Sequence, residues 1–331
     1  MSETSSTPAI SVVLCTYNGE QFIEEQLRSI LAQTLLPREI IISDDGSRDR
    51  TLEIAREVVQ ASRHDDIEWK ILERKKPLGP AQNFGEAMKK AQHEIIALAD
   101  QDDVWEPAKL EILSGHFSAD PGVLLVHSDA TIINDQGIAT GSLMNTLRVT
   151  SAELGLLASG QALRALVKRN LVTGATVVLR KSLLEAALPI PDGWVHDEWM
   201  ALVAGGQGAV SYEPLRLVRY RQHSGNQIGA NKTDIPEARR RLGESWSGFH
   251  AKKALRDQGI TALLASSPAR LSADNSGFLE GKVEHDRWRA RLPLPRALRF
   301  FPVWGRFITG HYSRYARGLI DVARDLSLTD G

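Results

Sequence analysis

Short apolar runs rich in β-branched residues alternate with longer amphipathic segments over the first 130 residues. Such runs predict strands, and apolar positions spaced three or four residues apart predict helices. The predicted strands are 10–14, 39–43, 67–72, 95–99 and 123–127. The predicted helices between them are 21–33, 49–62 and 81–92. Strands that alternate with helices favour an α/β fold, with a mostly parallel sheet covered by helices on both faces.

The alternation weakens after about residue 130, where the pattern predicts a mixed α/β region that completes the first half. Its predicted strands are 173–179, 209–212 and 215–221. Its predicted helices are 151–169, 181–187 and 197–204. From residue 233 onward the pattern is mostly helical, with prolines that end or kink helices. We expect a flexible N-terminus (1–9), two halves of one domain (10–130 and 131–232) and a helical C-terminal extension (233–331).

Composition limits the classes of protein to which the chain can belong. Its 331 residues, 42% of them hydrophobic, suffice for a sizeable core. A formal net charge of −1 gives no general attraction to nucleic acid, so we expect no nucleic-acid partner. Cys15 is the single cysteine, and neither a signal-like start nor an apolar span of about 18 residues is visible. We therefore expect a cytoplasmic protein without internal disulfides.

Acidic residues cluster where two of the predicted strands end. Asp100, Asp102 and Asp103 follow the fourth strand, and Asp44 and Asp45 follow the second. Neighbouring carboxylates repel one another unless a cation or hydrogen bonds compensate their charge. Mg²⁺ and Mn²⁺ prefer oxygen ligands and often bind through one or two carboxylates and substrate phosphates. The alternative is a solvated turn whose acids cap the helix that follows.

Further candidates for a functional site lie downstream. Asp197 and Glu198 open a predicted helix, where an acid can either cap the helix or take a proton from a hydroxyl group. His223 follows the last predicted strand and can be a metal ligand or an ordinary structural histidine. Arg219 and Arg221, in the same strand, can bind phosphate oxygens.

Three stretches together resemble glycosyltransferase family 2, the inverting, sugar-nucleotide-dependent enzymes of the GT-A fold. SVVLCTYNGEQFIEEQLRSILAQTL, followed by EIIISDDGSRDRTLEIA, is similar to the N-terminal signature of that family. ALADQDDVW resembles its Asp-x-Asp metal motif, and HDEW lies where its catalytic base is expected. The resemblance covers roughly residues 10–229. DQDDVW together with YRQHSGN further resembles bacterial rhamnosyltransferases and other transferases of cell-surface polysaccharides.

The resemblance implies roles for individual positions. The donor-binding positions would be Thr16, Tyr17, Asn18, Asp44, Asp45, Asn83, Asp100, Gln101 and Arg221. The metal-binding positions would be Asp102, Asp100 and His223. Asp197 matches the base that deprotonates the acceptor hydroxyl, but relatives often carry Glu-Asp here, so Glu198 stays open as the base. Asn83 has an alternative role as a cap of the helix near which it lies.

The implied reaction moves a sugar from a nucleoside-diphosphate donor to a hydroxyl of a glycan or lipid-linked acceptor in cell-surface polysaccharide synthesis. We expect a UDP- or dTDP-sugar such as dTDP-rhamnose as donor, with Mn²⁺ or Mg²⁺; 10–130 would bind the donor and 131–232 the acceptor. Two other classes stay open: a metal-dependent nucleotidyltransferase and a binding module without catalysis. A dehydrogenase is disfavoured, because the first strand leads into Thr-Tyr-Asn-Gly rather than a Gly-x-Gly-x-x-Gly turn.

The stretch 287–317 differs from the nearly neutral chain, with eight arginines, seven aromatic residues and no acid. Basic and aromatic residues together are typical of a surface that rests on an anionic membrane leaflet. We therefore expect peripheral contact with the inner face of the cytoplasmic membrane through 287–317. The alternative is that the aromatic residues pack this tail onto the catalytic domain while the arginines stay solvated.

Overall fold

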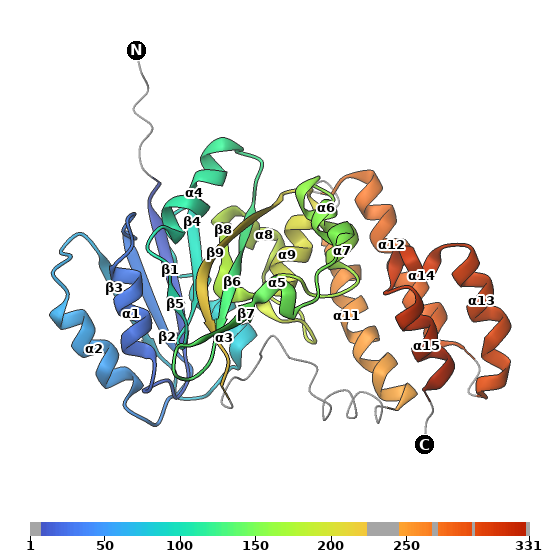
Figure 1. Ribbon diagram of the computed structural model, residues 1–331, viewed down its shortest axis with the longest axis horizontal. Coiled ribbons are helices and arrows are strands. Elements are labelled where there is room, and N and C mark those ends of the chain that lie inside the picture. The colour runs from blue at the N-terminus through green and yellow to red at the C-terminus, as the bar shows by residue number, and fades with distance from the viewer. Residues whose placement is uncertain (1–7, 224–244, 267–270, 293–294, 329–331) are drawn as a thin grey trace, which may run out of the picture.

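The computed structural model describes residues 8–223, 245–266, 271–292 and 295–328 (Figure 1). Its strands are β1 (Ile10–Thr16), β2 (Glu39–Asp44), β3 (Glu68–Glu73), β4 (Ile95–Asp100), β5 (Val104–Trp105), β6 (Leu125–Ile133), β7 (Ala139–Ser142), β8 (Val177–Arg180) and β9 (Val210–Arg221). They form one sheet in the order β3-β2-β1-β4-β8-β6-β9-β5, with β7 paired to β6.

Helices surround the sheet and continue beyond it. Those of the sheet region are α1 (Ile23–Leu31), α2 (Thr51–Ala61), α3 (Pro80–Met88), α4 (Lys109–Ala119), α5 (Leu143–Thr146), α6 (Ser151–Ala158), α7 (Ala162–Leu166), α8 (Leu184–Ala187) and α9 (His196–Gly206). The C-terminal helices are α11 (Trp246–Ser266), α12 (Ala273–Ala290), α13 (Phe300–Ile308), α14 (His311–Tyr315) and α15 (Leu319–Ser327). Short 3₁₀ turns are η1 (Gly174–Thr176), η2 (Lys181–Leu183) and η4 (Arg296–Arg299).

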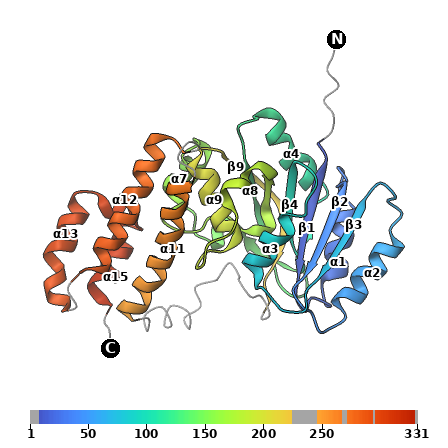
Figure 2. The ribbon, with the colours of Figure 1, turned by 180° about the vertical axis from the view of Figure 1, so that it is seen from behind.

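The N-terminal half of the sheet is parallel, as predicted, and its strands β1, β2 and β4 are buried, whereas the edge strand β3 is half-buried. β1 pairs in parallel with β2 and β4, and β2 pairs in parallel with β3. Alternate residues of a strand point to opposite faces. Val12 and Leu14 therefore pack with α1, α2 and α4, whereas Val13 and Cys15 pack with α3, α7 and α9. Helices cover both faces of this α/β sheet (Figures 1 and 2).

The register of the parallel strands brings polar residues to one edge. Thr16 at the end of β1 lies opposite Asp44 at the end of β2. On the other side of β1, Cys15 lies opposite Asp100, the last residue of β4. Ligands of open α/β sheets bind outside the carboxyl ends of the strands, so this edge positions the candidate site.

The other half of the sheet is mixed and corrects two strand predictions. β8 is antiparallel to both β4 and β6, while β9 is parallel to β6. The predicted strands 209–212 and 215–221 form one strand, β9, whose register against β6 shifts near Asp129. This irregular stretch contains Pro214, which cannot donate a ladder hydrogen bond and so interrupts the pairing. The predicted strand 173–179 is extended only from Val177 onward, after the turn η1.

The prediction of one helix over 151–169 is wrong, because the structure has two short helices there. α6 begins with a capping box in which the Thr150 side chain and Glu153 exchange hydrogen bonds with the backbone. The chain then turns at Gly160, whose φ of 71° lies in the left-handed region that favours glycine. α7 follows this turn and ends just before Lys168, so the split directs the next residues towards the candidate site.

The C-terminal helices pack together at one end of the molecule, beyond the sheet (Figures 1 and 2). They share an apolar core that includes Trp246, Val303, Tyr312 and Val322. The start predicted for this extension, residue 233, lies outside the described residues. In the described part of the chain, none of the helices combines the length and the apolar character required to span a bilayer.

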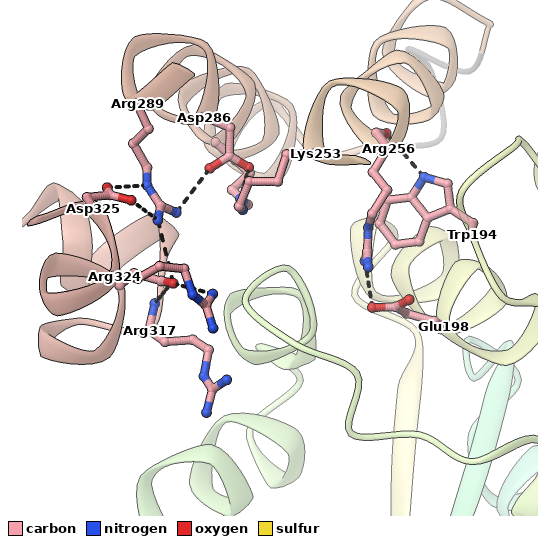
Figure 3. A network of polar contacts seen from close by, with 11 residues as sticks. Trp194, Glu198, Lys253, Arg256, Asp286, Arg289, Arg317, Arg324 and Asp325 are labelled. Atoms are coloured by element: carbon pink, nitrogen blue, oxygen red, sulfur yellow. Dashed lines mark hydrogen bonds and ion pairs between the residues drawn. The ribbon is translucent and has the colours of Figure 1, made fainter. Parts of the chain in front are cut away.

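A polar contact joins these helices to the sheet region (Figure 3). The Arg256 guanidinium on α11 donates to Glu198 Oε1 at 2.6 Å and lies over the ring of Trp194. The indole N–H of Trp194 in turn donates to the Arg256 carbonyl at 3.1 Å. Glu198 therefore holds α9 against α11.

A buried charge network stabilises the C-terminal helices (Figure 3). Arg289 on α12 is fully buried and donates through two nitrogens to the two oxygens of Asp325 on α15, at 2.7 Å each. The Tyr312 hydroxyl donates to the same carboxylate at 2.6 Å. Asp321 lies 3.5 Å from the Arg289 guanidinium. Removing one partner of a buried ion pair destabilises the folded protein, because the other charge stays buried without compensation.

We predict that Asp325→Asn destabilises the protein by about 3–5 kcal/mol, because Arg289 would remain buried with too little negative charge around it. Urea unfolding followed by tryptophan fluorescence measures the change. Asp274→Asn is the matched control, since the Asp274 side chain is 78% exposed and its ion pair with Arg164 is screened by water. Equal stability of the two variants would contradict a stabilising role for the network.

Candidate functional site

A cavity of about 1270 Å³ opens at the carboxyl ends of β1, β2 and β4. It brings together ten of the residues predicted for the site: Thr16, Tyr17, Asn18, Asp45, Asn83, Asp100, Gln101, Asp102, Asp197 and His223. Three predicted residues, Asp44, Glu198 and Arg221, are not part of its lining. The cavity therefore gathers residues that lie far apart in the sequence.

Asp44 and Asp45 make different contacts at the end of β2. Asp44 accepts hydrogen bonds from the Thr16 hydroxyl at 2.8 Å and from the backbone N–H of Ser47 at 2.8 Å. It closes a turn in which Gly46 has a φ of 90°, a conformation that a residue with a Cβ rarely adopts. Asp45 lines the cavity and accepts from two backbone N–H groups of the 78–79 segment, at 2.8 Å each.

Tyr17, Asn18 and Gln101 fix the loop that follows β1. The backbone of Tyr17 donates to Gln101 Oε1 at 2.8 Å, and the Gln101 side-chain amide donates back to the Tyr17 carbonyl at 3.0 Å. Asn18 has a positive φ of 49°, and its Oδ1 accepts from the backbone of Arg48 at 2.9 Å. The Tyr17 ring stays 37% exposed, so it can stack on a planar group that enters the cavity.

Asn83 lies on α3, where its buried side chain hydrogen-bonds to two other segments of the chain. Its Oδ1 accepts from the Ser43 hydroxyl at 2.7 Å and from the Arg74 guanidinium at 3.0 Å. Its side-chain amide donates to the Ser43 carbonyl at 2.9 Å. Asn83 therefore touches the cavity while it holds α3 to the end of β2.

Three carboxylates crowd the end of β4. Desolvation raises the pKa of Asp100 to about 7, with further contributions from the charges of Asp102 and Asp197. Burial also raises the pKa of Asp103 well above its usual value, as do the charges of Asp102 and Asp100. Asp103 Oδ1 accepts from a backbone N–H, but its buried Oδ2 has no hydrogen-bond partner among the described residues. Crowding and burial at this edge of the sheet therefore disfavour the ionised forms of Asp100 and Asp103.

Lys109 is a fully buried basic residue whose charge acts on this cluster. Its ammonium group donates to the Ala175 carbonyl at 2.7 Å and lies 3.4 Å above the centre of the Trp105 ring. Burial lowers its pKa well below the usual value, although Asp103 and Asp100 oppose that change. Sequence reasoning missed Lys109, because a lysine on an amphipathic helix ordinarily faces water.

His223 and Arg221 bring the end of β9 to the acid cluster. His223 Nε2 lies 2.8 Å from Asp102 Oδ2, and this hydrogen bond raises the pKa of His223. Arg221 is directed away from the cavity, since its guanidinium donates to the Asp102 carbonyl at 2.8 Å and to Glu25 at 2.6 Å. Arg219 likewise donates to a backbone carbonyl of the 134–138 turn. Arg221 therefore fixes the loop that carries the acids, and Arg219 fixes the 134–138 turn.

The donor set fits a divalent cation that completes its coordination with substrate. The described residues contain no ready-made group of three or more Cys, His, Asp or Glu side chains that could hold a metal ion. Asp102 Oδ2 and His223 Nε2 nevertheless lie 2.8 Å apart and near Asp100, so a cation that displaced their hydrogen bond could bind both atoms. A cation with two or three protein ligands keeps open positions for water and phosphate oxygens.

Asp197 lies at the N-terminus of α9 and faces the cavity. Its two oxygens accept from the backbone N–H groups of Gly174 at 2.8 Å and Glu198 at 2.6 Å. A Cβ at Gly174 would meet the ring of His196 at 2.6 Å, so glycine permits this close approach. Burial raises the pKa of Asp197 to about 6, although these hydrogen bonds oppose the shift. Glu198 points the other way, towards Arg256.

Sequence reasoning missed the basic residues near the cavity. They are Lys109, beside the acids, and Arg148, Lys168, Arg169 and Arg317, which line the cavity. Arg148 and Lys168 flank α6 and α7, which were predicted as one continuous helix. Arg317 belongs to the C-terminal helices, and only tertiary packing brings it to the cavity.

The chain belongs to glycosyltransferase family 2, because the model of Glycosyl transferase family 2 matches residues 11–185, more than half of its length. A relative among known proteins is the dTDP-rhamnosyl transferase RfbG of Shigella flexneri. It is 29% identical over 231 residues, which are 66% of this chain and 74% of that protein. The protein is therefore a glycosyltransferase.

Two solved structures show the same GT-A fold. One is S. aureus TarS 1–349 in complex with UDP-GlcNAc, with a TM-score of 0.58 and 15% identity; the match covers 96% of this chain and 90% of that one. The other is the mannosyltransferase PcManGT from Pyrobaculum calidifontis in complex with GDP-Man and Mn²⁺. Its TM-score is 0.51 at 18% identity, over 97% of this chain and 86% of that one.

Proposed function

We propose that this glycosyltransferase is a metal-dependent, inverting enzyme that moves a sugar from a nucleoside-diphosphate donor to an acceptor hydroxyl. The observation that carries the proposal is one cavity that holds Asp102 and His223 beside the carboxylate of Asp197. The complexes of TarS with UDP-GlcNAc and of PcManGT with GDP-Man and Mn²⁺ support a nucleotide-sugar donor and a divalent cation. Similarity to the Shigella flexneri enzyme supports a dTDP-sugar such as dTDP-rhamnose, with UDP-sugars as the other candidates.

The proposed donor site lies over the ends of β1, β2 and β4, within the predicted 10–130 half. Thr16, Tyr17, Asn18 and Asp45 line the part of the cavity that would take the nucleoside. Asp102, Asp100 and His223 would hold Mn²⁺ or Mg²⁺, with Gln101 fixing the loop between them. When bound, the cation would neutralise negative charge on the departing diphosphate.

Asp197 is the proposed base, supplied by the 131–232 half. An acceptor hydroxyl in the cavity would give its proton to this carboxylate as its oxygen attacks the anomeric carbon. The bond from that carbon to the diphosphate oxygen would break in the same displacement, so the configuration would invert. This reaction needs one catalytic carboxylate, unlike glycoside hydrolysis, which needs two. Glu198 is the weaker candidate because Arg256 holds its carboxylate outside the cavity.

We predict that Asp102→Asn and His223→Ala each weaken Mn²⁺-dependent binding of the nucleoside diphosphate by about tenfold or more, since each removes a metal ligand. Calorimetric titration of the protein with UDP, dTDP and GDP, with and without Mn²⁺, measures the effect. Asp66→Asn is the control, because its side chain is 90% exposed and lies outside the cavity. Unchanged nucleotide affinity in both site variants would rule out the proposed metal ligands.

We predict that Asp197→Asn lowers transfer by about a hundredfold or more and spares donor binding, whereas Glu198→Gln keeps most of the activity. The base must be ionised, and burial raises the pKa of Asp197 to about 6. The wild-type kcat/KM should therefore fall as the pH falls through about 6, and residual activity of Asp197→Asn should lack this step. Nucleoside diphosphate release from sugar nucleotides, with a glycan acceptor, measures both. Full activity of Asp197→Asn would assign the base elsewhere.

A lipid-linked acceptor is proposed from the surface of the C-terminal helices. α13 exposes large apolar side chains to solvent, with Phe301 81% and Ile308 69% exposed. The exposed Arg296 lies close to them in sequence, whereas Arg289 and Arg299 are fully buried and unavailable to lipid. We propose that this face of α13 rests on an anionic membrane surface, where acyl chains take apolar groups and headgroups attract the arginine.

We predict that the double variant Phe301→Ser, Ile308→Ser binds phosphatidylglycerol vesicles about tenfold or more weakly than wild type, since each buried apolar side chain contributes about 1.5–3 kcal/mol. Co-sedimentation measures binding. Leu215→Ser, which removes a 52% exposed apolar residue from β9, is the matched control. Equal binding of wild type and double variant would exclude α13 as the contact.

A further inference from the structure

The part of the cavity lined by α6, α7 and the C-terminal helices carries cations. Arg148 precedes α6, Lys168 follows α7, and Arg317 lies between α14 and α15, and all three line the cavity. Glu153 is the acid nearest to them in the lining, and both of its oxygens accept from the Arg169 guanidinium at 2.8 Å. The cavity therefore has an acidic end on the sheet edge and a basic end on the helices.

Arg317 is positioned by the buried charge network of the C-terminal helices. Its backbone N–H donates to Asp321 at 2.8 Å, and that carboxylate also receives the Arg324 guanidinium at 3.0 Å. Arg289 lies 3.5 Å from Asp321 and links this corner to Asp325. Figure 3 shows the side chain of Arg317 extending away from these acids, towards the neighbouring green helices. The network therefore fixes the backbone from which the Arg317 side chain extends.

Lys168 connects the same helices to the proposed base. Its ammonium group donates to the Ser313 carbonyl at 2.6 Å, which ties the end of α7 to α14. Two residues later, the Asn170 side chain hydrogen-bonds to Asp197. The segment 168–170 thus carries a cation of the basic end and a residue that orients the carboxylate of Asp197.

We propose that Arg148, Lys168 and Arg317 form a subsite for a phosphate or diphosphate ester on the acceptor. Guanidinium and ammonium groups make strong charge-assisted hydrogen bonds to phosphate oxygens. An anion at the acidic end would meet carboxylates, whereas an anion at the basic end would leave the acceptor hydroxyl directed towards Asp197. This inference rests on the proposed function, because it assigns the acceptor end of the same cavity.

The donor diphosphate is the other ligand that these three basic residues could bind, but the fold argues against this assignment. The residues proposed for the nucleoside come from β1, β2 and the loops after them, on one side of Asp102. The three cations come from the helices after β6 and from the C-terminal extension. A donor held at the sheet edge therefore leaves the basic end for a second substrate.

The test is calorimetric titration of inorganic phosphate into the full-length protein, with Mg²⁺ and saturating UDP or dTDP to fill the donor site. We expect Arg317→Gln and Arg148→Gln each to weaken phosphate binding by about tenfold or more, as expected for loss of a charged hydrogen bond. Arg296→Gln is the control, because it removes an exposed arginine outside the cavity. Nucleotide affinity should stay the same in every variant.

Two results would overturn the subsite: phosphate affinity that is equal in wild type and both variants, or nucleotide affinity that falls together with phosphate affinity. Thermal unfolding shows whether a variant is folded, and Lys168→Met provides a third variant at an independent position. If phosphate binding depends on Arg317 but no donor is turned over, the proposed function is wrong and the phosphate subsite stands. If the wild-type protein turns over a donor and the variants bind phosphate as wild type does, the phosphate subsite is wrong and the proposed function stands.

Competition distinguishes the two sources of a phosphate ester. Phosphatidylcholine vesicles that contain a polyprenyl diphosphate should displace phosphate if the acceptor is lipid-linked. Glucose 1-phosphate should displace phosphate if the acceptor is a soluble phosphorylated sugar. Either result supports the subsite, and displacement by neither would contradict it.

Discussion

The crowding of carboxylates at the carboxyl edge of the sheet is the constraint on which the site depends. Asp100, Asp102 and Asp103 lie within four residues, and Asp197 approaches them from α9. Two unit charges about 4 Å apart interact by roughly 4 kcal/mol at an effective dielectric constant of about 20. Repulsion of this size is tolerated because Lys109 lies beside the cluster and because protons are retained at raised pKa values. A cation bound with a diphosphate would relieve the same repulsion.

The residues around this charge divide into those that build the loops and those that face the cavity. Asp44, Asn83 and Arg221 use their polar atoms on neighbouring loops and strands. Their contacts hold Asp45 and Asp102 at the cavity wall. A sequence motif therefore contains two kinds of residue, and only the geometry separates the acid that closes a turn from the acid beside it that lines the cavity.

The C-terminal helices contribute to the same cavity. They are attached to α9 through Arg256 and Glu198, immediately beside Asp197. They also supply Arg317 to the lining of the cavity. The charge network around Arg289 thus stabilises the extension and fixes a wall of the cavity through the same contacts (Figure 3).

The parallel half of the fold could be predicted from the sequence, because β1, β2 and β4 are short apolar runs that end in polar loops. The acidic cluster could be predicted for the same reason. Three features could not, since each depends on contacts distant in sequence. These are the left-handed turn at Gly160 that splits a helical pattern, the burial of Lys109, and the position of Arg317. The arginine-rich tail was also ambiguous, because composition does not show that Arg289 is buried while Phe301 is exposed.

The most direct measurement is electron paramagnetic resonance of Mn²⁺ bound to the protein, with and without a nucleoside diphosphate. The proposed site offers few protein ligands, so we expect weak Mn²⁺ binding alone and much tighter binding when UDP or dTDP is added. The nucleotide should likewise bind more tightly when Mn²⁺ is present, since coupling between two ligands is reciprocal. Affinities that are independent of one another would contradict the claim that the acids hold a cation against a diphosphate.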